Sequence, residues 1–296
     1  MCIYKIDMKI SVIITSYKEP DTISKAIEAI LKQSQSLDLE LLVVAPDEET
    51  LHAAEKYKKV ITIKDTGNGK SAALNLVVPK TKGDILILTD GDVYIDSKAI
   101  SEIIKPFSDP LVGAVSGNVV STNQRNTMYG YWAHVLTKIA NDIRLEKLNS
   151  SGRFFCTGYL FGIRKELFPK LPTELLSEDG YISHKIYEKK RIIKYAPKAK
   201  VYVKYPDNFK DWIIQKKRSA GGYNQIKKLT NLQVRSFSSE SAGAFKILKY
   251  ISTIREFFWM TCLFIARLYL WFVIYRDINL KKKSQKEIWK RVESTK

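Results

Sequence analysis

Asp90 and Asp92 stand two residues apart at the end of an apolar run, 85–89. On extended backbone, side chains at i and i+2 point to the same side, so the two carboxylates can face one ion together. Gly91 between them has no Cβ to obstruct a ligand. Paired carboxylates suit Mg²⁺ or Mn²⁺, which keep open positions for phosphate oxygens. The pattern therefore predicts a metal–diphosphate site, with a solvated turn after a strand as the alternative.

Two other phosphate or metal motifs fail at specific positions. An EF-hand loop that starts at Asp90 needs Asp or Asn at position 94 and Gly at 95, where the chain has Tyr94 and Ile95. A Walker loop that ends at Lys70 needs Gly at position 64, where the chain has Lys64. Both readings are excluded.

Short apolar runs alternate with helical patterns over the first part of the chain. Strand patterns occupy 10–15, 39–44, 60–63 and 84–89, and helical patterns occupy 20–30, 48–58 and 70–78. This alternation predicts βαβ units and a parallel sheet covered on both faces, an α/β fold. Such sheets bind ligands at the carboxyl ends of their strands. The segments that follow the strands here are polar and charged, as a nucleotide-diphosphate site requires.

The composition limits which kinds of binding partner and which cellular compartment are expected. The chain has 296 residues, 45% of them hydrophobic, and a net charge of +18. Such a charge implies an anionic partner: nucleic acid, an acidic membrane surface or phosphorylated substrates. No nucleic-acid motif is found, so we expect no nucleic-acid partner. Three widely spaced cysteines indicate neither a disulfide framework nor a metal site, and the N-terminus has no signal-peptide pattern, so we expect a cytoplasmic catalytic part.

Four motifs occur in a fixed order between residues 9 and 223. They are Ser-Val-Ile-Ile-Thr-Ser-Tyr at 11–17, Gly-Lys-Ser-Ala-Ala-Leu-Asn at 69–75, Thr-Asp-Gly-Asp at 89–92 extending into 110–117, and Ser-Glu-Asp at 177–179. Together they resemble family 2 glycosyltransferases with the GT-A fold, a Rossmann-like mixed sheet with helices on both faces. The resemblance implies transfer of a sugar from a nucleotide-sugar donor to an acceptor hydroxyl, with inversion at the anomeric carbon and a divalent metal, Mg²⁺ or Mn²⁺.

The resemblance also implies donor-binding residues. Thr15 and Tyr17 look like the residues that hold base and ribose, in a loop that runs on to Glu19. Asp47 stands where the family offers an acidic residue to the base. The usual Asp-Asp-Gly-Ser run is replaced here by Ala-Pro-Asp-Glu-Glu at 45–49, so UDP- and GDP-linked donors both stay open. Lys70 looks like the basic residue near the donor phosphates, with Asp90 beside it and Asp92 on the metal.

An inverting transfer needs a base to take the acceptor proton. The resemblance points to Asp179 for this role, with Glu178 positioning it or the acceptor. The alternative is that Ser177 or Asp179 only caps the helix that follows. Gln215 and Arg218 resemble the Gln-x-x-Arg-Trp motif of processive members and would bind the donor, although Ser219 replaces Trp.

Residues 208–228 also fit a plain basic amphipathic helix, which is the alternative to that motif. Gly221 and Gly222 are candidates for a hinge in a segment that closes over the donor.

The last third of the chain carries a membrane signal. Residues 245–254 have apolar side chains at helical spacing, and 257–275 are nearly all apolar. Arg267 within this run costs roughly 2.5–3.5 kcal/mol at the centre of a spanning helix. A single span would also export the lysines at 281–283, against the positive-inside tendency. We therefore predict peripheral or re-entrant attachment to the cytoplasmic face of an anionic membrane, with a single span and a soluble packing role as alternatives.

These observations predict a catalytic domain at 1–230 and a membrane-attachment region at 231–296. The expected acceptor is a lipid-linked or membrane-proximal glycan. Three readings compete with this one: the same enzyme with a soluble acceptor, a sugar nucleotidyltransferase, and a non-catalytic basic membrane-binding protein on a transferase scaffold. A nucleotidyltransferase would carry a Gly-rich, Arg-containing loop after the first strand, and residues 16–20 read Ser-Tyr-Lys-Glu-Pro. Retention of Asp90, Asp92 and Asp179 argues against a decayed scaffold.

Overall fold

An eight-stranded mixed sheet forms the centre of the protein. The computed structural model describes residues 8–34, 37–150, 152–173, 175–230, 249–280, 292, 294 and 295. The strand order is β3-β2-β1-β4-β7-β6-β8-β5. The strands are β1 (Ile10–Thr15), β2 (Leu39–Ala45), β3 (Val60–Lys64), β4 (Ile85–Asp90), β5 (Tyr94–Ile95), β6 (Val112–Ser121), β7 (Leu160–Arg164) and β8 (Ile192–Val203).

The first four strands of this order are parallel, as the alternating pattern predicts. β1 is buried on both faces, and its side chains divide between two cores with the period of two expected for a strand. Val12 and Ile14 enter one core, while Ile13 enters the other. β7 then runs antiparallel to β4 and β6, and β5 antiparallel to β8, which makes the sheet mixed.

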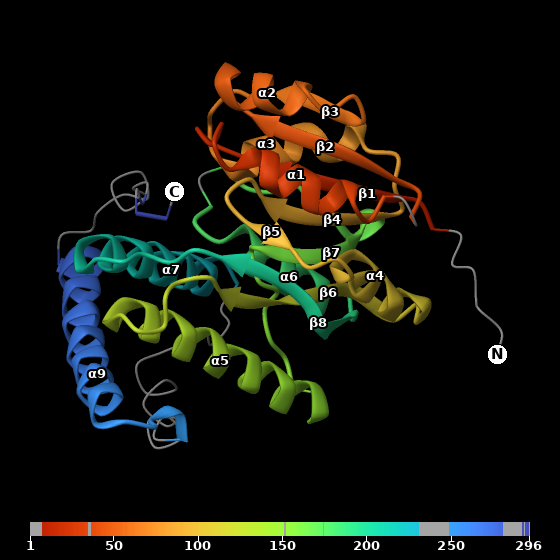
Figure 1. The fold of residues 1–296 in the computed structure, drawn as a ribbon. Helices are drawn as coiled ribbons and strands as arrows, with labels where there is room; N and C mark the ends of the chain where they lie inside the picture. The colour runs from red at the N-terminus through yellow and green to blue at the C-terminus, as the bar shows by residue number, and fades with distance from the viewer. Residues whose placement is uncertain are drawn as a thin grey trace.

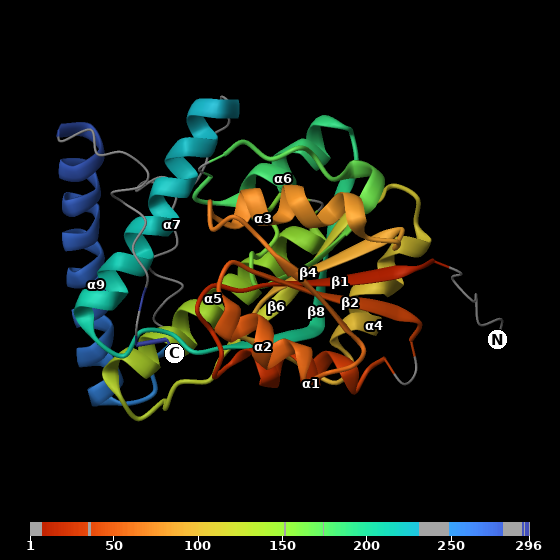
Figure 2. The same ribbon diagram turned by 90° about the horizontal axis from the view of Figure 1, so that it is seen from above.

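Helices cover both faces of the sheet (Figures 1 and 2). α1 (Ile23–Leu31), α2 (Glu48–Glu55) and α4 (Ala99–Ile104) pack on one face, and α3 (Lys70–Val77) and α6 (Glu178–Glu188) on the other. The helix expected to start near Pro20 and run past Ile30 forms as α1 with a later start, and the helix expected at 48–58 forms as α2 with an earlier end. α1 starts at Ile23 because Pro20 and the polar residues after it form a turn. Short turns η1 (Val78–Lys80), η2 (Lys105–Ser108) and η3 (Lys165–Leu167) complete this part.

A third core lies outside the sheet, between three long helices. They are α5 (Met128–Asn149), α7 (Phe209–Thr230) and α9 (Ile254–Ile274), followed by η5 (Tyr275–Leu280). Trp132 of α5 packs edge-on against Trp212 of α7, with ring centroids 5.4 Å apart, and its Nε1 donates to the carbonyl of Trp259 in α9 at 2.7 Å. This core contains residues from both sides of position 230. Truncation before α9 would therefore expose its aromatic residues to water.

The apolar pattern at 245–254 does not form a helix throughout. Residues 251–253 are not helical, Thr253 is the N-cap residue of α9, and its side chain accepts from Glu256 N. The helical prediction is therefore wrong for 251–253, because the side-chain oxygen of Thr253 starts the helix at the following residue. Residues 245–248 lie outside the described residues. Among the described residues, one helix, Ile254–Asp277, is long and apolar enough to cross a membrane.

Candidate active site

The parallel pairing of β1 and β4 brings two predicted site residues together. Thr15 and Asp90 are register partners at the carboxyl ends of these strands. The Thr15 hydroxyl donates to Asp90 Oδ1 at 3.1 Å and lies 3.4 Å from the carbonyl oxygen of Thr89. Both residues come directly after buried strands, so the sheet itself sets their separation. The carboxyl edge is where an α/β sheet is expected to bind its ligand.

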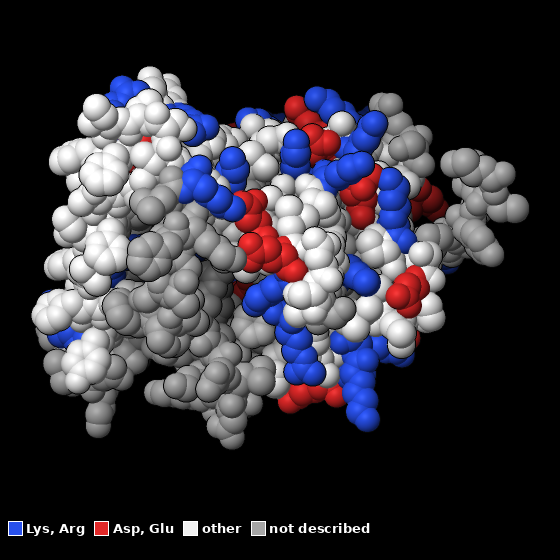
Figure 3. Space-filling model, turned by 90° about the horizontal axis from the view of Figure 1, so that it is seen from below, with Lys and Arg blue, Asp and Glu red and all other residues white. Residues whose placement is uncertain are grey.

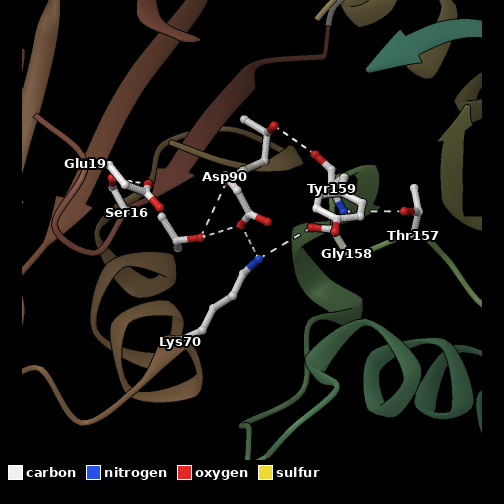
Figure 4. A network of polar contacts seen from close by, with 9 residues as sticks. Ser16, Glu19, Lys70, Asp90, Thr157, Gly158 and Tyr159 are labelled. Carbon is white, nitrogen blue, oxygen red and sulfur yellow. Dashed lines mark hydrogen bonds and ion pairs between the residues drawn. The ribbon is translucent and has the colours of Figure 1, made fainter. Parts of the chain in front are cut away.

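Lys70 reaches this edge from the first residue of α3. Its Nζ donates to Asp90 Oδ1 and lies 3.4 Å from the carbonyl oxygen of Gly158, on the segment before β7 (Figure 4). Burial alone would lower the pKa of Lys70, but the carboxylates of Asp90, Glu178 and Asp179 outweigh it, so the pKa is raised. Lys70 is therefore cationic at neutral pH and suited to an anionic ligand.

The turn at Gly91 is packed from behind by a buried carboxylate. Glu19 Oε2 accepts from the Ser16 hydroxyl at 2.6 Å, and both side chains are buried. A Cβ on Gly91 would lie 2.3 Å from Ser16 Oγ and 2.6 Å from Glu19 Oε2. Glu19, expected to bind the donor, thus supports the Asp90–Asp92 turn from inside. The glycine between the two aspartates is required by this close packing.

Glu178 and Asp179 lie in the first turn of α6, and both carboxylates interact electrostatically with Lys70. The Ser177 hydroxyl donates to Asp179 Oδ1 at 2.6 Å. A Cβ on Gly158 would lie 3.4 Å from Asp179 Oδ2, which puts this carboxylate beside the segment that Lys70 contacts. Ser177 is the N-cap residue and makes no side-chain capping bond. The contacts therefore give no support to a purely capping role.

Burial governs the acid–base state of Glu178. Desolvation raises the pKa of its carboxyl, the positive charge of Lys70 partly offsets this, and the negative charges of Asp179 and Asp90 raise it further. A carboxyl group whose pKa is shifted by burial and by charged neighbours is typical of a catalytic site, although structural ion pairs also produce such shifts.

Tyr159 is buried near several charged residues of the predicted site. Burial raises the pKa of its hydroxyl well above the usual value, and Tyr205 raises it further; the positive charge of Arg218 lowers it, and the negative charges of Asp92 and Asp90 raise it. Gln215, on the same helix as Arg218, is buried, and its Oε1 has no hydrogen-bond partner among the described residues. A buried amide oxygen of this kind is suited to a donor from a ligand.

Asp47 and Tyr17 lie farther along the edge. Asp47 is the N-cap residue of α2: one carboxylate oxygen accepts from Thr50 N at 3.1 Å and the other from Lys18 N at 2.7 Å. Burial would raise the pKa of Asp47, but hydrogen bonds from the Thr50 hydroxyl and from the backbone N–H groups of Lys18 and Thr50 lower it overall. Tyr17 is 40% exposed, and Lys18 Nζ lies over its ring, 5.6 Å from the centroid. Asp47 also connects the loop after β1 to α2, a structural role that the sequence reasoning did not include.

The carboxylates of Asp90 and Asp92 are the candidate ligands for a divalent ion. No group of three or more His, Cys, Asp or Glu side chains suited to an ion occurs in the described ranges. Mg²⁺ and Mn²⁺ do not need one, because they bind through one or two carboxylates plus substrate phosphates and water. Asp90 Oδ1 accepts from Lys70 and Thr15, and the carboxylates of Asp90 and Asp92 supply hard oxygen atoms of the kind that these ions bind. The residues therefore fit an ion that arrives with a diphosphate.

Two contributors had no signal in the sequence. Gly158 offers its carbonyl to Lys70, and Tyr159 places its carbonyl 2.8 Å from the Thr89 hydroxyl. Both belong to the segment that precedes the antiparallel strand β7, which pairs with β4. A Thr-Gly-Tyr run is too common to single out, and only the pairing of β7 beside β4 brings it to the site.

Comparisons with known proteins agree with this fold. The sequence model of glycosyl transferase family 2 matches residues 11–171, more than half of the chain. A probable glycosyltransferase, YdaM, from Bacillus subtilis is 26% identical over 239 residues, covering 74% of this chain and 56% of that protein. The O-antigen chain rhamnosyltransferase RfbN from Salmonella typhimurium is 29% identical over 214 residues, covering 66% of each chain. The chain thus spans about half to two thirds of these relatives.

Among solved structures, the mannosyltransferase PcManGT from Pyrobaculum calidifontis, in complex with GDP-Man and Mn²⁺, has a similar fold. The TM-score is 0.63 at 18% identity, covering 94% of this chain and 88% of that one. Mannosyl-3-phosphoglycerate synthase from Rubrobacter xylanophilus gives a TM-score of 0.52 at 15% identity, covering 78% of each chain. The GT-A fold expected from the motifs is thus confirmed. The chain belongs to glycosyl transferase family 2.

Proposed function

We propose that this protein transfers a sugar from a UDP- or GDP-linked donor to a hydroxyl of a lipid-linked or membrane-proximal glycan, with inversion at the anomeric carbon. The observation that carries the proposal is the meeting of Lys70, Asp90, Glu178 and Asp179 around Gly158 at the carboxyl edge of the sheet. A cation for a diphosphate and a carboxylate for a proton lie side by side there. Family membership supplies the reaction class.

In this reaction the acceptor oxygen forms a bond to the anomeric carbon while the bond from that carbon to the diphosphate oxygen breaks. Asp179 takes the proton from the acceptor hydroxyl as the bond forms. Ser177 fixes the orientation of its carboxylate by donating to Oδ1, so Oδ2 is left for the acceptor. Lys70 stabilises the negative charge that develops on the leaving diphosphate. Arg218 of α7 would assist it.

Asp90 and Asp92 would hold the divalent ion, Mg²⁺ or Mn²⁺. When bound, such an ion offsets the charge of the donor phosphates and of the leaving group. Without it, two aspartates would repel a diphosphate placed beside them. PcManGT, which shares the fold, binds GDP-Man together with Mn²⁺. We infer the same kind of dependence here from the two aspartates of this chain.

We propose that the protein attaches to the cytoplasmic face of a membrane through helix α9. From 257 to 275 none of its exposed positions carries a charge. Nine large apolar side chains on the helix are 44–90% exposed: Ile254, Phe257, Phe258, Phe264, Ile265, Leu268, Tyr269, Phe272 and Tyr275. Figure 3 shows this side of the molecule, at the left, as mostly free of charged residues. An exposed apolar surface of this kind is typical of membrane or protein contact.

The opposite face of α9 is covered by protein. Met260, Leu263, Ala266 and Leu270 are buried in the third core against α5 and α7, and Arg267 is half-buried. A spanning helix would have lipid or other apolar spans around it, whereas this one packs on the catalytic part along one side. We therefore propose that α9 lies in the membrane plane with its exposed face in one leaflet. The region 231–296 would then serve as the attachment region of a catalytic domain at 1–230.

Binding and turnover assays with the full chain test the proposed function. Nucleotide sugars with UDP and GDP carriers are screened by thermal shift in Mn²⁺, since a ligand that binds the folded state raises its apparent stability. The donor that stabilises the protein is then offered with lipid-linked and soluble acceptors, and nucleoside diphosphate release is measured. Acceptor-dependent release supports the proposal. A transfer to soluble acceptors alone favours the alternative acceptor, and no stabilisation by any donor contradicts a transferase role.

A further inference from the structure

Helix α7 lies between the membrane-facing helix α9 and the turn that carries Glu178 and Asp179. Figure 2 shows α7 running between α9 and the rest of the molecule. Its residues take part in the third core with α9, and its second half contacts α6. One rigid helix therefore contacts both the attachment region and the proposed base. The contacts at its two sides decide how firmly these parts are joined.

α7 packs closely against the turn that carries Ser177 and Asp179, the proposed base. A Cβ on Gly222 of α7 would lie 2.7 Å from the Cβ of Ser177, and a Cβ on Gly180 of α6 would lie 2.2 Å from Ile226 Cδ1. Leu176 N donates to Gln225 Oε1 at 3.0 Å. Such distances leave no room for an extra methyl group, so α7 and the Ser177 turn are in direct contact. Gly222 is therefore a close-packing glycine inside α7, in the segment where a hinge was expected.

On the side of α9, a fully buried carboxylate anchors α7. Asp277 lies in η5, directly after α9, and its side chain is 1% exposed. It accepts from Lys217 Nζ of α7 and from Arg276 Nε at 3.1 Å. A carboxylate removed from water in this way is stable only when it is paired and hydrogen-bonded. Asp277 thus holds Lys217 in place, and Lys217 lies little more than one helical turn before Gly222.

We propose that Asp277 is a positioning residue for the proposed base. Through Lys217 it fixes α7 against α9, and α7 in turn fixes Ser177, which donates to Asp179 Oδ1. The inference rests on the proposed function for the role of Asp179, but the structural connection stands on its own contacts. It gives the attachment region a part in catalysis: the end of α9 sets where the base-bearing turn lies. Asp277 itself touches neither donor nor acceptor.

The first test measures the connection between Asp277 and the Ser177 turn without an activity assay. Amide hydrogen exchange is measured on the full chain for wild type, Asp277→Asn and Lys217→Met, in peptides that cover 175–181. Faster exchange is expected there in both variants, because loss of the ion pair loosens α7. Lys217→Met leaves Asp277 paired with Arg276, so it serves if Asp277→Asn does not fold. Unchanged exchange at 175–181 in a folded variant overturns the proposal, whether or not the protein is a transferase.

A matched control uses another carboxylate that holds the C-terminal part. Asp142 of α5 accepts from Lys249 Nζ at 2.9 Å and from the Tyr250 hydroxyl at 2.6 Å, and within the described part of the chain its hydrogen bonds go to residues outside α6 and α7. Asp142→Asn removes the same kind of group from the same helix assembly. It should leave exchange at 175–181 unchanged. An equal effect in this control would mean general loosening and would contradict a specific role for Asp277.

The second test measures the catalytic constants of the same variants. In Asp277→Asn and Lys217→Met, kcat should fall roughly ten- to a hundredfold, as expected for a small displacement of a catalytic group. The affinity for nucleoside diphosphate should change little, because Lys70 and Asp90 are untouched. The double variant should be no worse than the more impaired single variant, since both remove one interaction. An unchanged kcat, or multiplying losses, would show that the pair only stabilises the fold.

Discussion

Lys70 donates to the carboxylate of Asp90 across twenty positions of sequence, joining the start of α3 to the end of β4. The contact arises because β4 ends and α3 begins at the same edge of a parallel sheet. It neutralises one of two adjacent aspartates while keeping a cation available for phosphate. Among the described lysines, Lys70 alone has a pKa that is raised by the carboxylates of Asp90, Glu178 and Asp179 together.

Lys70→Met should weaken binding of the nucleoside diphosphate by roughly tenfold or more, because a charge-assisted contact with a phosphate is lost. Isothermal titration calorimetry in Mn²⁺ measures it. Lys64→Met is the matched control: Lys64 also pairs with a carboxylate, that of Glu48, but its side chain is 59% exposed at the end of β3. The control should bind as wild type does. Equal affinity in both variants would contradict a role for Lys70 in donor binding.

Donor binding should depend on a divalent ion. Titration of nucleoside diphosphate in Mn²⁺ and again in excess chelator compares the two affinities, and we expect the second to be roughly tenfold or more weaker because Asp90 and Asp92 then face the phosphates directly. Asp92→Ala should abolish most of the Mn²⁺ effect and of turnover without unfolding the domain. Identical affinities with and without the ion would contradict a metal role for the two aspartates.

The part of this site that sequence predicts is the part built from regular strands. Buried runs before Thr15 and Asp90 indicated parallel strands, and polar segments after them indicated one shared edge, which the register of β1 and β4 confirms. Gly158 was not found, because its place depends on the antiparallel pairing of β7 with β4. The roles of Glu19 and Asp47 in supporting loops were also missed, since a carboxylate has the same pattern whether it faces a ligand or a backbone N–H.

The C-terminal region shows a second limit of sequence reasoning. Hydrophobicity identified the apolar run at 257–275, but it could not show that one face is covered by Trp132 and Trp212 from distant helices. Arg267 was counted as a penalty for a spanning helix, and the structure makes it half-buried beside the protein-facing residues. Long-range packing decides these points, and it leaves no periodic pattern in the local sequence.

Asp179→Asn should keep donor affinity and lose sugar transfer, because the amide preserves shape but cannot take the acceptor proton. A fall of roughly a hundredfold or more in kcat is expected. Nucleoside diphosphate affinity, measured on the same sample, controls for a collapsed site. Asn is also a favourable N-cap residue, so near wild-type transfer by this variant would support a structural role for Asp179.

Gly91→Ala should destabilise the fold by roughly 1–3 kcal/mol, as expected when an atom is forced into a packed site. The new Cβ would lie 2.3 Å from Ser16 Oγ, and Glu19 closes the same space. Gly158→Ala is the matched control, because its Cβ would meet Asp179 Oδ2 at an ordinary 3.4 Å. Urea unfolding of both variants gives the comparison. Equal stabilities would mean that the Asp90–Asp92 turn is looser than its contacts indicate.

Membrane attachment should depend on the exposed face of α9. Phe264→Asp and Phe272→Asp place charges at positions that are 57% and 61% exposed, so each should weaken binding to anionic vesicles roughly tenfold or more without unfolding the protein. Leu111→Asp, at a position 56% exposed just before β6, is the control and should bind as wild type does. Co-sedimentation with anionic and neutral vesicles measures the effect. Added salt should weaken the anionic preference.

The side of the membrane on which the C-terminus lies distinguishes a helix in the membrane plane from a spanning helix. A tag placed after Lys296 is exposed to protease in sealed inverted vesicles, whose cytoplasmic face is outward. Because α9 is covered on one side by α5 and α7, which belong to the same part of the molecule as the catalytic sheet, both ends of α9 should stay on the cytoplasmic side. The tag should be cleaved without detergent, as should a control tag placed before Met1. Protection of the C-terminal tag alone would mean that α9 leaves the third core and spans the bilayer.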